Sequence, residues 1–446
     1  MSTSMNGMAR AEGAKDAAND AAKDATRAAG RQEARSGGRP ALPPAAELAA
    51  MLRESTERLA RELAQPSDEP PAWHEAGWRV AMAAATIHGV AGLLADRLRW
   101  EGPPLWQAFL ADQRHQMRQR EQRIRDTLQR IDLEARRDGL PVVGLKGSAL
   151  LSMNLYAPGR RPMADIDLLV RPEDRLTALR MLARLGYRPG VDSGRHLTLL
   201  PASSAPHAPV HLGEHADHAV KLELHTRVAE PLPAREVDIT ARILPASARP
   251  GLRPYPGRAA LMRHLLLHAA GNMRTRSLRL IQLHDLALMA DRLTESDWTS
   301  LAAGEGGHAP AWWALPPLRM ALRHFPSCGI DEHRLRAFEP GCPPWLRRHA
   351  REASLTDLST SRLFCPWLPG LVWARDPVEA LRLVRARLWP SRAAKEQSRA
   401  ARGAEAWIRD NPTASLPRWA RVRRWRIDGL PAARFSVEQA MAYEWR

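Results

Sequence analysis

Residues 161–170 read RPMADIDLLV and place two aspartates, Asp165 and Asp167, in a short hydrophobic run. In a β-strand, residues i and i+2 point to the same face, so the two carboxylates project together while Ile166 points into the core. Two like charges this close are costly unless cations hold them or one side chain is protonated. Mg²⁺ prefers carboxylate oxygens, and substrate phosphates usually complete its coordination. The segment therefore predicts a strand that carries a metal site.

The sequence just before this strand predicts a phosphate-binding turn. Residues 140–145 read LPVVGL, follow Gly139 and predict a buried strand, and the short helix expected next opens with Gly147 and Ser148. Glycine lets the backbone approach a ligand closely, and the start of a helix offers free N–H groups. The Ser148 hydroxyl adds a donor, although it could equally be a plain helix N-cap. The turn is not a Walker motif.

A third carboxylate follows in a later predicted strand. Glu223 lies between Leu222 and Leu224. If this strand lies beside the strand of the two aspartates, three carboxylates converge and can hold two metal ions. His225 follows Glu223 by two residues, so it faces the same side and is a candidate to orient an acceptor or to ligate a metal. The alternative for both residues is an ordinary position on a strand.

These motifs resemble a known family. Residues 145–150 (LKGSAL), Tyr156, residues 161–170 and the Glu223–His225 element are similar to uncharacterised bacterial nucleotidyltransferases of the polymerase-β-like superfamily. The similarity is specific over residues 139–228. It implies that a nucleoside triphosphate, ATP among the candidates, binds with Mg²⁺. An acceptor hydroxyl then attacks the α-phosphorus and pyrophosphate leaves.

The resemblance also implies roles for individual residues. Asp165 and Asp167 would bind both metal ions, which we expect to be two Mg²⁺ ions, with Mn²⁺ as an alternative. Glu223 would complete the metal nearer the acceptor and assist its deprotonation. Gly147 and Ser148 would hold the β- and γ-phosphates. We add Lys146 and Arg161 as residues that neutralise triphosphate charge, the alternatives being an exposed lysine and a loop arginine paired with an acid.

The resemblance does not name the acceptor, which could be a protein, a small molecule or an RNA. An alternative function is a non-catalytic nucleotide-sensing or partner-binding accessory protein that retains the fold. A third interpretation is a basic RNA-binding protein with an incidental Asp-x-Asp motif. An intact set of three carboxylates favours the enzyme, because neutral replacements would be expected if the charges served nothing.

The rest of the chain predicts an α+β protein, with a small mixed sheet and packed helices inside a mostly helical body. We expect an Ala/Arg/Gly-rich disordered tail over 1–44, since it has too few large apolar residues to fold. A helical region follows over 45–138, then the nucleotidyltransferase α/β core over 139–235, a helical domain over 236–340 and a basic Trp/Arg-rich helical region over 341–446. Within the core, a helix over 172–185 is expected to bury the stripe Leu176, Leu179, Leu182 and Leu185.

Composition narrows the choice of partners. The 446 residues carry a net charge of +17, of which +10 lies in residues 341–446, so this region is a candidate polyanion-binding surface. The alternative is a solvated arginine-rich surface, because a GC-rich genome would also favour arginine. No run of 18 apolar residues occurs, so we expect no membrane contact. The absence of a signal-peptide pattern and the three scattered cysteines predict a cytoplasmic protein.

One histidine-rich segment lies outside the motifs. His207, His211, His215 and His218 are spaced four, four and three residues apart, which on a helix would be one face and a zinc site. Pro206, Pro209 and Gly213 make a long helix improbable there, so a solvated flexible loop is expected.

Overall fold

The computed structural model describes residues 42–203, 211–232, 236–304, 310–366, 368–392 and 416–444. The predicted disordered tail falls outside these residues up to position 41, as does His207. The chain from Pro43 onward forms one compact unit.

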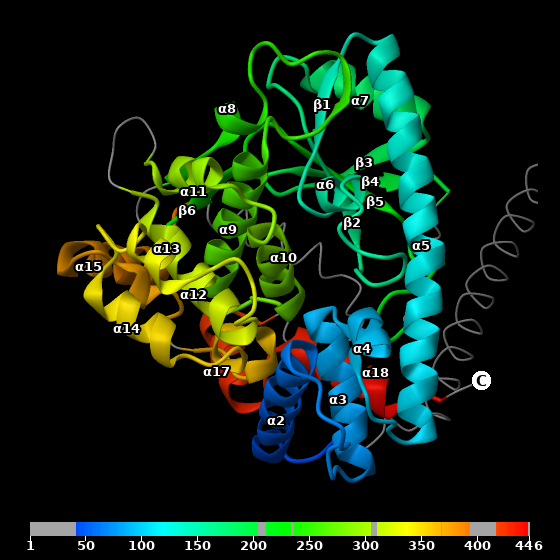
Figure 1. The fold of residues 1–446 in the computed structure, drawn as a ribbon, viewed down its shortest axis with the longest axis vertical. Helices are drawn as coiled ribbons and strands as arrows, with labels where there is room; N and C mark the ends of the chain where they lie inside the picture. Colours follow the sequence, from blue (N-terminus) through cyan, green and yellow to red (C-terminus); the bar gives the residue numbers. More distant parts are fainter. Residues whose placement is uncertain are drawn as a thin grey trace, which may run out of the picture. The chain divides into compact units, whose positions relative to one another are not determined.

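Six strands form a mixed sheet in the order β3-β4-β5-β2-β1-β8 (Figure 1). Their bounds are β1 Pro141–Gly144, β2 Asp165–Leu169, β3 Tyr187–Asp192, β4 Leu197–Pro201, β5 Lys221–His225 and β8 Gly251–Arg253. Strand β2 pairs antiparallel with β1 and parallel with β5. The β8 strand, beyond residue 235, pairs parallel with β1. A second sheet contains β6 (Ala229–Pro231) and β7 (Glu236–Asp238). The mixed sheet and its surrounding helices confirm the predicted α+β class.

One face of the main sheet packs against two helices, α5 (Pro104–Arg137) and α7 (Arg175–Arg184). Alternation along β2 and β5 directs apolar side chains to this face, where they join residues of α5 spaced three and four apart. The shared core contains Ile124, Leu128, Ile131 and Ala135 of α5, and Ile166, Leu168, Leu222 and Leu224 of the strands. The polar residues of β2 and β5 are thereby left on the opposite face.

Helix α7 packs Leu179, Leu182 and Leu185 of the predicted stripe against the sheet, but not Leu176. It buries Ala178, Met181 and Leu182, whereas Leu176 is 69 % exposed. At 100° per residue, Leu176 lies on the side of the helix opposite the buried residues. The prediction was therefore wrong at Leu176, because leucines alone do not decide which face of a helix meets the sheet.

Helices make up most of the remaining body. Within the predicted helical region over 45–138, Gly89 adopts φ +67° and ends α3. The helices before the sheet are α2 Ala45–Ala64, α3 Glu75–His88 and α4 Ala91–Arg97. Those within and after the sheet region are α6 Gly147–Ser152, α8 Thr240–Ile243, α9 Arg258–Thr275, α10 Leu280–Ala290, α11 Glu295–Ala302 and α12 Leu315–His324. The last ones are α13 Glu332–Arg336, α14 Pro344–Glu352, α15 Pro377–Leu388, α17 Arg418–Ile427 and α18 Pro431–Met441.

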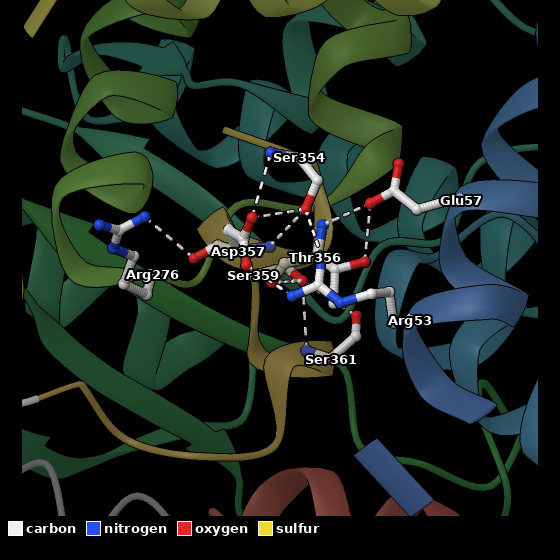
Figure 2. Close-up of polar contacts among 8 residues, drawn as sticks. All are labelled: Arg53, Glu57, Arg276, Ser354, Thr356, Asp357, Ser359 and Ser361. Carbon is white, nitrogen blue, oxygen red and sulfur yellow. Dashed lines mark hydrogen bonds and ion pairs between the residues drawn. The ribbon is translucent and has the colours of Figure 1, made fainter. Parts of the chain in front are cut away.

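Polar contacts connect helix α2 to a segment three hundred residues later in the chain (Figure 2). Glu57 accepts hydrogen bonds from the Thr356 backbone N–H at 2.9 Å and from its hydroxyl at 2.7 Å. Arg53 pairs with Asp357 at 2.7 Å, and Arg276 of the α9 C-terminus donates to the Asp357 carbonyl oxygen at 3.0 Å. The first described helix and the region after α14 therefore belong to one packed body.

Among the described residues, no single helix is long and apolar enough to cross a membrane. Helices α3 and α4 would reach that length and composition only together, and they are bent by 114° at their junction. Most of their residues are buried inside the protein.

Candidate active site

The three predicted carboxylates meet on one face of the sheet. In the parallel pairing of β2 with β5, Asp167 lies opposite Glu223 and Asp165 lies opposite Lys221. Alternation then places Asp165, Asp167, Glu223 and His225 together, on the face away from α5. Sequence analysis could only assume that the strand of Glu223 lies beside the strand of the two aspartates. The structure shows that β5 and β2 are neighbours.

The two aspartates differ in how far neighbouring positive groups compensate their negative charge. Partial burial, together with the neighbouring charges of Asp167 and Glu223, raises the pKa of Asp165 to about 7. Burial acts in the same direction on Asp167, but the Lys146 ammonium and a hydrogen bond from His225 hold the pKa of Asp167 well below its usual range. The Lys146 Nζ lies 2.8 Å from Asp167 Oδ1, and His225 Nε2 lies 3.0 Å from the same oxygen. The site therefore has excess negative charge centred on Asp165, which is the condition that attracts a cation.

The turn between β1 and α6 is strained and anchored. Lys146 adopts φ +47°, which is uncommon for a residue with a side chain and is found at sites where the surroundings impose it. Its backbone N–H donates to the Tyr255 hydroxyl at 3.2 Å, and this hydroxyl contacts His264 Nδ1 at 2.6 Å. Burial holds the pKa of His264 well below its usual range, so the ring stays neutral. Tyr255 and His264 thus fix the turn from the side of α9.

Next to this turn, Gly147 and Ser148 have the properties expected of a ligand-binding segment. A Cβ atom at Gly147 would lie 2.8 Å from Arg161 Nη1, so a larger residue there would displace the end of the Arg161 side chain. The Ser148 side chain is 3 % exposed, and its hydroxyl oxygen is buried with no hydrogen-bond partner among the described residues. A buried hydroxyl without a partner costs free energy, so the Ser148 hydroxyl is a candidate to donate a hydrogen bond to a bound phosphate.

Arg161 is held by a buried acid. Its Nε and Nη2 donate to the two oxygens of Asp285 on α10, each at 2.8 Å. Tyr156 donates its hydroxyl to Asp285 Oδ1 at 2.7 Å. Asp285 is 2 % exposed. Arg161 is therefore paired with an acid, which was the alternative considered from the sequence. Its Nη1 atom lies beside Gly147.

The structure adds a residue that sequence analysis missed. His196, just before β4, lies close enough to Glu223 and His225 for the three side chains to offer ligand atoms within 4.8 Å of one another. Burial lowers the pKa of His196, so a neutral imidazole is available as a ligand. Its position follows from the antiparallel pairing of β4 with β5, in which Thr198 lies opposite Glu223. No local motif around His196 indicated this pairing.

A comparison with known protein families shows which family the chain belongs to. A family described as uncharacterised nucleotidyltransferase matches residues 74–304, just over half of the chain. The chain belongs to this nucleotidyltransferase family. It is accordingly a transferase of phosphorus-containing groups. No curated protein and no solved structure gives a match in the corresponding comparisons.

The matched region of this nucleotidyltransferase includes a second residue that sequence analysis missed, Arg120 of α5. Its side chain is 3 % exposed and donates to the carbonyl oxygens of Met163 (2.8 Å), Ala164 (2.7 Å) and His218 (2.6 Å). Glu214 pairs with it at 2.9 Å. Arg120 therefore joins the residues before β2 to the residues before β5. This contact fixes the relative positions of the strands that carry Asp165 and Glu223.

Proposed function

We propose that this protein is a divalent-metal-dependent nucleotidyltransferase that transfers a nucleoside monophosphate from a nucleoside triphosphate to an acceptor hydroxyl. The observation that carries the proposal is the parallel register of β2 and β5, which sets Asp167 opposite Glu223 with Asp165 on the same face. Family membership supports the reaction type. The metal, the acceptor and the leaving group are the parts that we add.

The donor set fits a metal ion. Three carboxylates share one face, and the raised pKa of Asp165, caused by partial burial and by its acidic neighbours, reflects charge that no side chain fully compensates. We assign Asp165, Asp167 and Glu223 to hold Mg²⁺, with Mn²⁺ favoured if His225 or His196 also coordinates, because imidazole suits later divalent ions better. Bound divalent ions stabilise the attacking and leaving oxygens of phosphoryl transfer.

The chain's own residues supply binding and proton transfer. The Ser148 hydroxyl and the Gly147 amide are assigned to the β- and γ-phosphates, and Arg161 Nη1 and the Lys146 ammonium to neutralising their charge. The Glu223 carboxylate accepts the proton of the acceptor hydroxyl as its oxygen bonds to the α-phosphorus. The bond from that phosphorus to the bridging oxygen breaks, and pyrophosphate leaves with the electron pair. Positioning and charge carry most of the stabilisation in such transfers.

Label transfer tests the proposal. Purified protein is incubated with each α-³²P-labelled nucleoside triphosphate, Mg²⁺ or Mn²⁺, and a host extract divided into protein, RNA and small-molecule fractions. The test variant is Asp165→Asn/Asp167→Asn. The matched control is Asp192→Asn, an exposed carboxylate on edge strand β3 of the same sheet.

Label in one fraction with the wild type and the control, and none with the double variant, is the expected result, and it would also name the acceptor class. Metal-dependent nucleotide binding without transfer would instead support a nucleotide-sensing accessory protein. The absence of nucleotide binding would reject the proposal. Label in the RNA fraction would extend the proposal to the basic region 341–446 as the surface that contacts the acceptor.

A further inference from the structure

A second group of metal-ligating side chains lies in the segment 211–218, which leads into β5. The sequence predicted a solvated flexible loop there. The structure instead packs this segment along α5, where Gln113 donates to the Leu212 carbonyl oxygen at 2.9 Å and accepts from the Glu214 N–H at 3.0 Å. Gln116 accepts from the Ala216 N–H at 2.9 Å. Together with Arg120, these contacts from one stripe of α5 give the segment a defined backbone conformation.

The defined backbone brings histidines together. His211, His215 and Asp217 each offer one ligand atom, and these atoms lie within 4.8 Å of one another. The rings of His211 and His215 stack at 3.6 Å with an angle of 7° between their planes. The ring of His218 lies 5.7 Å from His211 and 5.9 Å from His215, measured between ring centroids. Three imidazoles and a carboxylate therefore share a small volume without any helix to align them.

The imidazoles are available as ligands. His211 Nε2 is buried and has no hydrogen-bond partner among the described residues. Burial lowers the pKa of His211, and burial together with the Arg120 charge lowers the pKa of His218 to about 4, so both rings stay neutral at pH 7. A neutral imidazole keeps the lone pair that a metal requires. The backbone N–H of Asp217 donates to His215 Nδ1 at 3.1 Å and so orients that ring.

We propose that His211, His215 and Asp217 bind a Zn²⁺ ion, with His218 within reach as a fourth ligand. Two or three imidazoles with one carboxylate suit zinc and disfavour Mg²⁺ or Ca²⁺, which take oxygen ligands. Metal–nitrogen bonds of about 2.0–2.1 Å in a tetrahedral site bring ligand atoms to about 3.4 Å from one another. The present separations of up to 4.8 Å have to shorten, and the stacked rings of His211 and His215 have to move apart, when the ion binds.

Two arginines of α5 near the site have polar partners of their own. Arg120 pairs with Glu214 at 2.9 Å, and Arg123 donates to the carbonyl oxygen of Ala216. Asp217 supplies the negative charge of the ligand set. Zinc here would hold the segment against α5 a few residues before Lys221, where β5 begins. The site is therefore structural, and it stands independently of the proposed transfer reaction.

Metal binding is measured on the full chain by Co²⁺ absorption spectroscopy and by Zn²⁺ titration calorimetry. Both are done in a His196→Ala/His225→Ala background, which removes the imidazoles of the other candidate metal group. The test variant adds His211→Ala/His215→Ala. The control adds His333→Ala instead, an exposed histidine on α13. His215→Cys, which keeps a zinc ligand, is the conservative variant.

We expect the background protein and the His333→Ala control to bind one equivalent of Zn²⁺ and to give the visible bands of tetrahedral Co²⁺. The His211→Ala/His215→Ala variant should lose both signals, and His215→Cys should keep them. Asp217→Asn should weaken binding by at least about 10-fold, since even the loss of an outer-shell partner costs roughly 10–100-fold. Equal zinc stoichiometry and affinity in the test variant and the control would overturn the proposal, as would no zinc binding by the background protein.

Discussion

The buried ion pair between Arg161 and Asp285 allows a quantitative test of how the helical body supports the candidate active site. Asp285→Asn removes the negative charge from a side chain that accepts two hydrogen bonds from Arg161 and one from Tyr156. Asp285 is 3 % and Arg161 16 % exposed as side chains, so the arginine cannot regain full hydration. Removing one partner of a buried pair costs about 3–5 kcal/mol. Because Arg161 keeps some exposure, we expect the lower end, about 3 kcal/mol.

The assay is urea unfolding followed by tryptophan fluorescence, applied to a double-mutant cycle of Asp285→Asn and Arg161→Met. The double variant should be less destabilised than the sum of the single variants, with a coupling of about 0.5–3 kcal/mol. Asp192→Asn breaks the exposed pair with Arg175, whose side chains are 51 % and 44 % exposed, and should cost about 0–1 kcal/mol. A loss for Asp285→Asn no larger than for Asp192→Asn, or a cycle without coupling, would refute the reasoning.

Three further outcomes are expected. Ser148→Ala should raise the KM for the nucleoside triphosphate about 10-fold or more, since a hydrogen bond to a charged group contributes about 1.5–3 kcal/mol. Its free energy of unfolding should not decrease, because the hydroxyl has no hydrogen-bond partner among the described residues, and an unchanged KM would contradict the assigned role. In metal-free protein, the pKa of Asp165 of about 7 lies above its unfolded value of 3.8, so this group's contribution to stability is full below pH 3.8 and is lost as the pH rises through 7. Urea unfolding across this range should show that Asp165→Asn flattens the decline, and an identical slope in both proteins would count against the raised pKa. Arg120→Met should cost about 3 kcal/mol and lower nucleotide transfer, because it leaves Glu214 and four carbonyl oxygens without their partner. Arg137→Met, on the exposed side of α5, should change neither quantity.

The α+β class and the strands next to the Gly147–Ser148 turn and the Asp-x-Asp motif were predictable from local signals. Residues 140–145 predict a strand because valines and leucines follow a glycine, and the structure has β1 there. Residues 166–170 predict a strand because apolar residues lie next to two aspartates, and the structure has β2 there. Strand β8 was missed because three residues, Gly251–Arg253, give no periodic pattern and pair only with the distant β1. The break at Gly89 was missed because an apolar stretch continues on both sides of it.

Some residues of the candidate site were also predictable from the sequence, and others were not. Asp165, Asp167, Glu223, Gly147 and Ser148 were recognisable because their chemistry lies in short motifs. His196 and Arg120 were not, since each acts through a partner far away in the sequence.

The sequence by itself determined which carboxylates and which turn are candidates for the site, and it indicated the nucleotidyltransferase family. Local spacing suffices for this, because alternation along a strand fixes which side chains share a face. Only the tertiary structure decided which strands are neighbours, that Arg161 is bound by Asp285, and that the histidines of 211–218 meet without a helix. These features depend on packing between segments distant in the chain, where burial and hydrogen bonding across elements select one arrangement among many that the local sequence permits.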